Sequence, residues 1–512
     1  MHHCLTKALA TATAAAFTLL PVAPVFGADR DDFPTRTPIK HVVVIFQENV
    51  SFDHYFGTYP NAEKNKDGSV LFAGAKQDTP RVNSLQSAGL LTNNPNGVSP
   101  FRIDRSNAVT CDEDHGYADE EFAFDGGLMD RFAKLSCTDK NLGANSTFGY
   151  FDGNTVTALW NYAQHFAMSD NSFGTTFGPS TPGLLNLVAG NTFEGTIMNG
   201  KSAKGNIASA ATSGAVIGDP DPFGDVCSAP GRAQITMSGQ NVGDLLNNAG
   251  VTWGSFMGGF ANCAAVSTGL SGTTGDYIPH HAFFQYWQST LNANHTPRTS
   301  VALIGHQGDA ANHEYDLTDF WDAVKANNMP AVSFLKARAF QDGHAGYSNP
   351  LDEQQFLVST INALQQTDEW KETAVIIAYD DSDGWYDHVM GPIVNQSNVS
   401  DDQLLGPGNC GTPSAKQVGG ADQNGRCGYG PRLPLLVISP YAKKNYVDHR
   451  VSDQSSILRF IEDNWNLGRI GAGSTDAIAG SLSGLVDFDD SGRAGKLILD
   501  PVTGRVVNSG SN

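Results

Sequence analysis

Positively charged residues are scarce in this chain of 512 residues. Lys and Arg number 32 against 53 Asp and Glu, so the formal net charge is -21 at pH 7. Because proteins engage phosphate backbones mainly through Lys and Arg, this balance argues against nucleic acid as a partner. Charged residues make up only 17% of the chain, whereas glycine reaches 55 residues. We therefore expect a surface of loops and neutral polar side chains.

Long hydrophobic runs are absent after the N-terminus. The run that follows Lys7, ALATATAAAFTLLPVAPVF, is interrupted by Pro21 and Pro24, which is typical of a secretory signal rather than a membrane-spanning helix. We expect residues 1–27 to be a signal peptide cleaved near Gly27; an uncleaved anchor is the alternative. The sequence thus predicts an exported protein, periplasmic or secreted, without a transmembrane anchor.

No CxxC spacing occurs, which argues against a structural zinc site. Of the seven cysteines, Cys4 belongs to the predicted signal peptide. The other six form three pairs of close neighbours in the sequence, Cys111 with Cys137, Cys227 with Cys263, and Cys410 with Cys427. An even number in an oxidising compartment favours disulfides, and pairing between these neighbours is our hypothesis.

Internal repeats and linkers between domains are also missing, and strand-like runs alternate with helix-like ones. The predicted strands are His41–Phe46, Ser300–Ile304, Ala331–Phe334, Thr373–Tyr379 and Leu433–Ser439. The predicted helices are Val156–Phe166, Leu317–Asn327, Glu353–Gln366 and Ser455–Trp465. This alternation predicts an α/β fold with a mostly parallel sheet and helices on both faces. We expect residues 28–512 to form one domain, with a surface insertion at about 199–276.

Polar side chains follow two of the predicted strands. Glu48 and Asn49 come just after the first strand, and Asp380 and Asp381 come directly after the strand at 373–379. Ligands gather at the carboxyl ends of parallel strands, and divalent ions take carboxylate and amide oxygens. These residues therefore predict a metal site, whereas either pair alone would be read as a solvated acidic loop.

A candidate nucleophile lies in the segment FGPSTPGLL. Gly178 and Pro179 predict a tight turn that places Ser180 at the start of a helix, where free backbone N–H groups favour a phosphate or an oxyanion. Ser180 could instead be an ordinary helix cap, and Thr181 could fill either role. The chain has no GxSxG motif, which argues against a carboxylester hydrolase.

Several histidines lie in loops punctuated by glycine and proline. His115 follows an acidic run, His280 and His281 are adjacent, and His344 lies in QDGHAGYSNP. A single loop histidine is usually a surface residue. Together, these are better explained as partners of a phosphate or a metal, because imidazole can ligate, donate hydrogen bonds and protonate a leaving group.

The chain resembles the bacterial phosphoesterase family of secreted phospholipases C and acid phosphatases. The resemblance rests on seven segments that keep their order from His41 to Trp465: HVVVIFQENVSFDHYFGTYP, CDEDHGYADEEFAFDGGLMDRF, FGPSTPG, YIPHHAFFQYW, GHAGYSNPLDEQQFLV, ETAVIIAYDDSDGWYDHV and GYGPRLPLLVISPYAKKNYVDHRVSDQSSILRFIEDNW.

The resemblance implies an alkaline-phosphatase-like α/β core with long loop insertions and a hydroxyl nucleophile at Ser180. It also implies a divalent metal ion, of unspecified identity, on Glu48, Asn49, Ser180, Asp380 and Asp381. The histidines His115, His281 and His344 match catalytic positions, and His280, with Asn49, matches a substrate-binding one. The acidic optimum that the resemblance implies suits histidines that are protonated.

Three residues distinguish this chain from many phospholipases C of the family. Those proteins resemble YDExGGFYDHV and GPTxPNR, where this chain has Asp381 for Glu, Ser180 for Thr and Gly183 for Asn. These departures resemble the acid phosphatase branch. We therefore expect a phosphatase acting on small phosphate monoesters, with a phospholipase C acting on phosphatidylcholine-type diesters as the alternative. The oligomeric state stays open.

Overall fold

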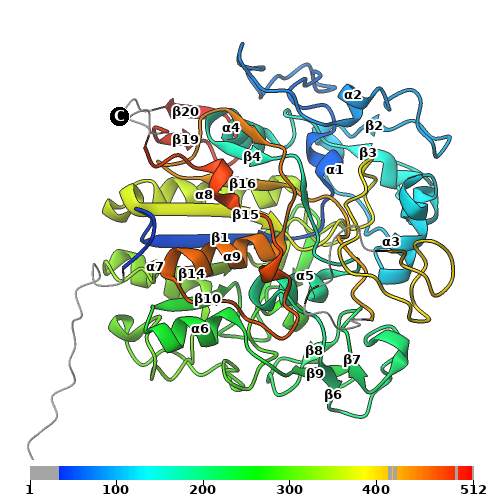
Figure 1. Cartoon of the computed structure of the whole chain (residues 1–512). Coiled ribbons are helices and arrows are strands. Elements are labelled where there is room, and N and C mark those ends of the chain that lie inside the picture. Colours follow the sequence, from blue (N-terminus) through cyan, green and yellow to red (C-terminus); the bar gives the residue numbers. More distant parts are fainter. Residues whose placement is uncertain (1–33, 413–417, 419–423, 490–493, 510–512) are drawn as a thin grey trace, which may run out of the picture. The chain divides into compact units, whose positions relative to one another are not determined.

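A large mixed sheet forms the centre of the protein (Figure 1). The structure is a computed structural model, which describes residues 34–412, 418, 424–489 and 494–509. The predicted signal peptide, residues 1–27, lies outside the described residues. The sheet has eight strands, in the order β13 (Glu314–Asp316), β10 (Trp253–Met257), β14 (Val332–Lys336), β1 (His41–Gln47), β15 (Thr373–Tyr379), β16 (Leu435–Ile438), β4 (Ala167–Ser169) and β17 (Tyr446–Asp448).

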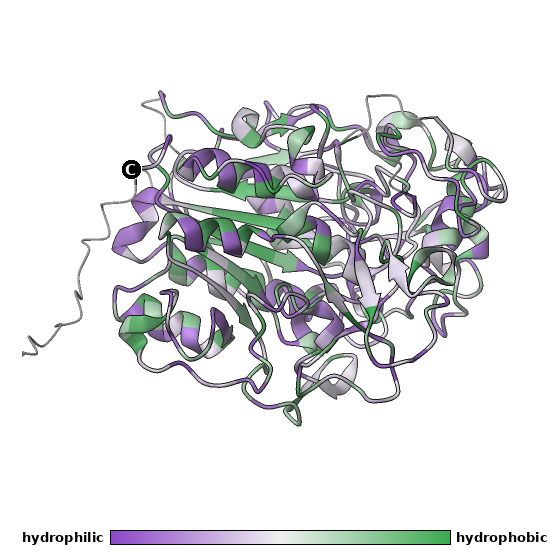
Figure 2. Ribbon diagram, turned by 60° about the horizontal axis from the view of Figure 1, so that its bottom comes forward, coloured by the Kyte–Doolittle hydropathy of each residue, from purple (hydrophilic) through white to green (hydrophobic). Residues whose placement is uncertain are grey.

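The strands from β13 to β15 run parallel, as the alternating sequence pattern predicts. β16 runs antiparallel to both of its neighbours, and β17 is parallel to β4. β1 and β15 are buried along their whole length, because their continuous apolar runs are covered on both faces. Figure 2 shows these hydrophobic strands at the centre and hydrophilic residues on the outer helices.

Helices lie on both sides of the sheet (Figure 1). They are α1 (Phe52–Phe56), α2 (Leu85–Ala88), α3 (Tyr117–Phe124), α4 (Thr157–His165), α5 (Ser180–Ala189), α6 (Val242–Ala249), α7 (Leu317–Lys325), α8 (Pro350–Leu364) and α9 (Gln454–Trp465). α5 packs against α9 and α6, whereas α8 packs against α4. The α/β fold with a mostly parallel sheet is therefore confirmed.

Two expectations from the sequence are wrong. The segment Ser300–Ile304 is not a strand but a 3-10 turn at Val301–Leu303, because most of its side chains stay partly exposed and Gly305 turns the chain with a φ of 81°. The stretch 199–276 is not a surface insertion throughout, since β10 and α6 belong to the core of the sheet layer.

Shorter pairs and a small sheet build the loops. The small sheet is β7 (Ser213–Gly214), β6 (Gly195–Ile197), β9 (Gln234–Met237) and β8 (Asp221–Pro222). The paired strands are β11 (Val266–Gly269) with β12 (Gly272–Gly275), β5 (Ser172–Phe173) with β18 (Ser452–Asp453), β2 (Phe101–Arg102) with β3 (Gly149–Tyr150), and β19 (Leu497–Leu499) with β20 (Val506–Ser509).

Three disulfides fasten these loops. They join Cys111 to Cys137, Cys227 to Cys263, and Cys410 to Cys427. The hypothesis of pairing between neighbouring cysteines is confirmed. In the part of the chain that the structure describes, no helix is both long and apolar enough to cross a membrane.

Candidate active site

The carboxyl ends of β1 and β15 lie next to each other. The two strands pair in register up to their last residues, so the loops that follow leave the sheet at the same edge. Glu48, Asn49, Asp380 and Asp381 are all at most 2% exposed. The backbone N–H of Asn49 donates to Asp380 Oδ1 at 3.4 Å. The structure thus brings together the four residues that the sequence places behind two buried strands.

Ser180 is directed at this cluster from the first turn of α5. Its Oγ donates to Glu48 Oε2 at 3.1 Å or to Asp381 Oδ2 at 3.2 Å. Ser180 is not the helix cap, because that position belongs to Pro179. The Thr181 hydroxyl instead donates to the backbone oxygen of His280 at 3.1 Å. The hydroxyl that meets the carboxylates is therefore that of Ser180.

Glycine lets α5 approach the strand end so closely. A Cβ atom at Gly183 would lie 2.3 Å from the backbone oxygen of Asp380, so any larger residue would push the helix away. Gly178 has a φ of 109°, which favours glycine, and its N–H donates to Glu120 Oε2 at 3.0 Å. The backbone of the GPSTPG segment, through Gly178 and Gly183, thus sets the position of Ser180.

The oxygens of the cluster fit a divalent cation. Asn49 Oδ1 and Asp380 Oδ2 are buried and accept no hydrogen bond from any described residue. Burial, the largest contribution, raises the pKa of Glu48 to about 7, and burial together with neighbouring carboxylates raises the pKa of Asp380 and Asp381 well above the usual range. A bound cation would remove this electrostatic cost. Glu48, Asn49, Ser180, Asp380 and Asp381 can therefore supply the predicted set of oxygen ligands.

A lysine side chain of the protein itself lies beside this cluster, and it is not among the residues that the sequence analysis singles out. Lys336 is the last residue of β14 and is 2% exposed. Its Nζ donates to Glu48 Oε1 and lies 3.8 Å from Asp380 Oδ2. Burial opposes the charge, but the carboxylates of Glu48 and Asp380 outweigh it and raise the pKa of Lys336. The only signal in the sequence is a lysine that ends the apolar run VSFL.

His281 and His280 approach the cluster from a 3-10 turn at Pro279–His281. His281 Nδ1 lies 3.1 Å from Glu48 Oε1, and burial, with cations nearby, lowers the pKa of His281 well below its usual value. His280 Nδ1 lies 3.6 Å from Asp221 Oδ1, a carboxylate outside the cluster. His281 is therefore a neutral ring against the carboxylate cluster, whereas His280 lies nearest to a different carboxylate, Asp221.

His344 and His115 stand across from each other, with ring centroids 6.1 Å apart. Burial lowers the pKa of His344 to about 4, and its Nδ1 lies 2.6 Å from the backbone oxygen of Ala345. Burial therefore disfavours the protonated form of His344 and of His281, against the expectation that the site histidines are protonated. Both lie inside the fold, where the charged form of imidazole loses its hydration.

His115 is the histidine of the site whose charge the surroundings favour. Its Nδ1 lies 2.8 Å from the backbone oxygen of Glu113 and 3.5 Å from Asp383 Oδ1, and its Nε2 lies 3.4 Å from Asn49 Nδ2. Burial alone would lower the pKa of His115, but the carboxylate of Asp112 and the Glu113 carbonyl outweigh it and raise the pKa. His115 thus links the metal cluster to the acidic loop before α3.

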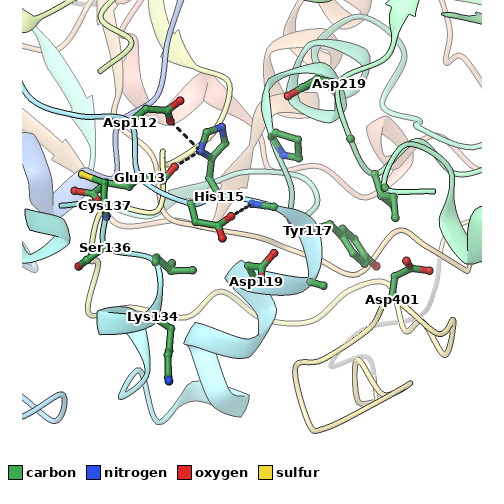
Figure 3. Close-up of a pocket in the computed structure, with 18 residues that line it drawn as sticks. Asp112, Glu113, His115, Tyr117, Asp119, Lys134, Ser136, Cys137, Asp219 and Asp401 are labelled. Carbon is green, nitrogen blue, oxygen red and sulfur yellow. Dashed lines mark hydrogen bonds and ion pairs between the residues drawn. The ribbon is translucent and has the colours of Figure 1, made fainter. Parts of the chain in front are cut away.

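A cavity of about 630 Å³ opens beside His115 (Figure 3). Pro179, which precedes the candidate nucleophile, forms part of its wall. Figure 3 shows carboxylates around this cavity from separate segments of the chain. The acidic residues of the wall are Asp112, Glu113, Asp114, Asp119, Asp219 and Asp401. Lys134 is the basic residue beside them.

Curated relatives of the chain are phospholipases C. The non-hemolytic phospholipase C of Pseudomonas aeruginosa is 25% identical over 436 residues, which cover 84% of this chain and 54% of that protein. Phospholipase C A of Mycobacterium tuberculosis is 25% identical over 470 residues, covering 89% and 79%. Non-specific phospholipase C3 of Arabidopsis thaliana is 22% identical over 446 residues, covering 83% and 68%. The chain spans about half the length of the Pseudomonas relative.

Solved structures resemble the chain only distantly. Murine ectonucleotide pyrophosphatase/phosphodiesterase 5 has 12% identity and a TM-score of 0.32, over 65% of this chain and 95% of that one. A mutant of the alkaline phosphatase PafA has 8% identity and a TM-score of 0.34, over 64% and 94%. These scores carry no argument about the site, so the fold rests on the sheet itself. The phosphoesterase family matches residues 39–468, which confirms the predicted family: the chain belongs to the phosphoesterase family.

Proposed function

We propose that the protein is a phosphoric ester hydrolase with Ser180 as its nucleophile. The observation that supports this most strongly is the position of Ser180 Oγ, 3.1 Å from Glu48 Oε2 and 3.2 Å from Asp381 Oδ2 at the start of a helix. A hydroxyl held between carboxylates that fit a metal, at the positive end of a helix, suits attack on an anionic phosphorus centre.

The reaction would proceed in two displacements. Ser180 Oγ attacks phosphorus, its proton passes to the carboxylate of Asp381 or Glu48, and the ester P–O bond breaks as His115 gives a proton to the leaving oxygen. Water then attacks the phosphoseryl group and gives a proton to His115, while the carboxylate returns its proton to the Ser180 oxygen as the P–O bond to serine breaks. A divalent ion, when bound, supplies charge neutralisation for the phosphoryl oxygens and lowers the pKa of the serine hydroxyl.

The remaining residues bind and orient the phosphoryl group. Asn49 and His280 would donate hydrogen bonds to its oxygens. The single N–H of each neutral ring is already directed at the Ala345 carbonyl (His344) or at Glu48 Oε1 (His281), so their Nε2 atoms would accept a hydrogen bond from a protonated phosphoryl oxygen. The N-terminus of α5 adds the positive end of the helix dipole, whereas its Thr181 N–H already donates to Asp219 Oδ1 at 2.9 Å and Pro182 has no N–H. These roles follow from side chains that face the Ser180 cluster or its rim.

The favoured candidate substrate is a phosphodiester of the kind that phospholipases C cleave. The curated relatives that cover most of this chain carry that name, which supports the alternative over the acid phosphatase that the sequence led us to expect. Phosphate monoesters remain the second candidate. They are favoured by the combination of Ser180, Gly183 and Asp381 in place of Thr, Asn and Glu.

The deciding experiment compares p-nitrophenylphosphorylcholine with p-nitrophenyl phosphate between about pH 5 and 8. Turnover of the diester at a higher kcat/KM supports the phospholipase C proposal, whereas preference for the monoester supports the phosphatase. Loss of both activities after metal removal, verified by elemental analysis, supports the metal. Full activity of a metal-free preparation would contradict it.

We also propose that the protein works outside the cytoplasm. Its three disulfides suit an oxidising compartment. Mass spectrometry of the protein isolated from its native host would test the predicted signal peptide. A mature N-terminus near residue 28 is expected, and an intact N-terminus would contradict cleavage.

A further inference from the structure

Lys336 is a buried cation whose partners are two candidate metal ligands. Its Nζ contacts Glu48 Oε1 and lies 3.8 Å from Asp380 Oδ2. The side chain is 2% exposed, and its ammonium lies 5.7 Å from the centre of the Phe46 ring. Burial of this lysine costs free energy, because an ammonium loses its hydration when it is buried. The roles proposed above do not use it.

The two oxygens of Glu48 serve different partners. Oε1 receives Lys336 and lies 3.1 Å from His281 Nδ1, whereas Oε2 accepts the Ser180 hydroxyl. The ammonium therefore contacts one oxygen of the Glu48 carboxylate, and the other oxygen remains available to the Ser180 hydroxyl. Asp342, a further buried carboxylate of this region, has donors of its own in the His344 N–H and the Tyr347 hydroxyl.

The charges of the site explain what a cation at this place can do. Glu48, Asp380 and Asp381 carry three negative charges when ionised, so a divalent ion alone would leave the centre with one negative charge. Lys336 brings that sum to zero. Because the whole chain is also acidic, at -21, an anionic ester has little long-range attraction to draw it in. Local neutralisation of the centre is therefore decisive for binding phosphate.

We propose that Lys336 is a permanent counter-cation of the metal centre, which weakens binding of the divalent ion and strengthens binding of the phosphoryl group. This inference rests on the proposed function, because it takes Glu48 and Asp380 as metal ligands. It assigns to one residue two effects of opposite sign. A residue that only supported the fold would weaken both kinds of binding when it is removed.

The test uses the full-length protein with Lys336→Met, which keeps the length of the side chain and removes the charge. Mn²⁺ affinity is measured by electron paramagnetic resonance, and binding of inorganic phosphate to the Mn²⁺-loaded protein by calorimetry. We expect Mn²⁺ to bind about tenfold more tightly and phosphate about tenfold more weakly, as the loss of one charge at close range in a buried site implies. Lys336→Arg, which keeps the charge, should shift both affinities less, and Lys76→Met is the control for loss of a lysine far from the site.

Each outcome decides the matter. Weaker binding of both ligands by Lys336→Met would overturn the proposal, and so would tighter Mn²⁺ binding with unchanged phosphate binding, because Lys336 would then only compete with the metal. If the variant is unstable, Mn²⁺ must raise its Tm more than it raises that of the unmodified protein; an equal or smaller rise would contradict the proposal. Failure of the unmodified protein to bind Mn²⁺ or to hydrolyse phosphoesters would instead refute the proposed function.

Discussion

Two acidic regions lie side by side in this protein and differ in their surroundings. The first is the buried cluster of Glu48, Asp380 and Asp381 at the strand ends, where the carboxylates are at most 2% exposed. The second is the wall of the cavity beside His115, where the side chain of Asp112 is 55% exposed. Water can solvate the exposed carboxylates of the wall, such as Asp112 and Asp119, although Glu113 is buried, whereas the cluster depends on Lys336, Ser180 and the proposed metal. The same residue type thus forms the proposed cation site in one place and a polar surface in the other.

The difference teaches that acidic composition alone says little about a site. In water, neighbouring carboxylates interact weakly and salt screens them, whereas inside the fold each charge must be compensated. The chain is acidic throughout, but the carboxylates behind β1 and β15 are buried, leave Asp380 Oδ2 without a hydrogen bond and receive the Ser180 hydroxyl on Glu48 or Asp381. Burial together with this hydroxyl distinguishes the proposed cation site from solvated carboxylates.

The largest effect is expected at the nucleophile beside the buried cluster. Ser180→Ala should lower kcat for p-nitrophenyl esters by about a thousandfold or more, because the attacking oxygen is gone. Thr181→Val is the matched control, since its hydroxyl faces the His280 carbonyl, and it should retain most of the activity. A comparable loss of kcat in the two variants would contradict the assignment of Ser180, rather than Thr181, as the nucleophile.

A large effect on metal binding is expected for the cluster but not for the wall. Asp380→Asn should weaken Mn²⁺ binding by about a hundredfold or more, because it removes a charged ligand. Asp119→Asn, on the exposed wall, should change it by less than about twofold, since solvent screens this charge. Titration of both variants by electron paramagnetic resonance measures the contrast, and equal losses would contradict it.

The pH dependence of stability should be altered by Glu48 in the metal-free protein. Its pKa is raised by burial to about 7 from 4.5, so the folded state favours the protonated form. Stability from this group is present below about pH 4.5 and is lost as the pH rises through about 7. Glu48→Gln should therefore gain Tm relative to the unmodified protein between pH 5 and 8 in a chelator, and Mn²⁺ should reduce the gain. A difference in Tm that does not vary with pH would contradict this.

The smallest effect is expected from the wall of the cavity. Asp119→Asn should raise kcat/KM for an anionic ester by about threefold or less at low salt, and Lys134→Gln should lower it by a similar factor, because both act through long-range attraction. At about 0.5 M salt both effects should vanish. Effects that persist at high salt would mean that these residues contact the substrate.

The strand ends were predictable from the sequence, whereas their partners were not. A buried apolar run that stops at Glu48 or at Asp380 places those residues at one sheet edge whatever the loops do. The position of Lys336 at the end of a strand does not predict its burial, because a lysine after an apolar strand usually marks the point where the chain reaches solvent. Its burial depends on the neighbouring strand β1, which lies far away in the sequence.

The errors in the fold have a similar cause. β10 was missed because its residues, WGSFM, contain glycine and serine and lie in a stretch that reads as loop. The apolar run of β16 does not predict that this strand is antiparallel to β15, since strand direction depends on the loop that connects the two strands. Local composition predicts an element's burial poorly when packing from distant segments supplies it.

The central claim is tested most directly by trapping the phosphorylated protein. The protein is mixed with excess p-nitrophenyl ester, quenched with acid within milliseconds, digested and analysed by mass spectrometry. We predict on Ser180 a phosphorylcholine group from p-nitrophenylphosphorylcholine or a phosphoryl group from p-nitrophenyl phosphate, absent from Ser180→Ala treated in the same way. A phosphoryl group on a histidine such as His115, with Ser180 unmodified, would contradict the proposed mechanism.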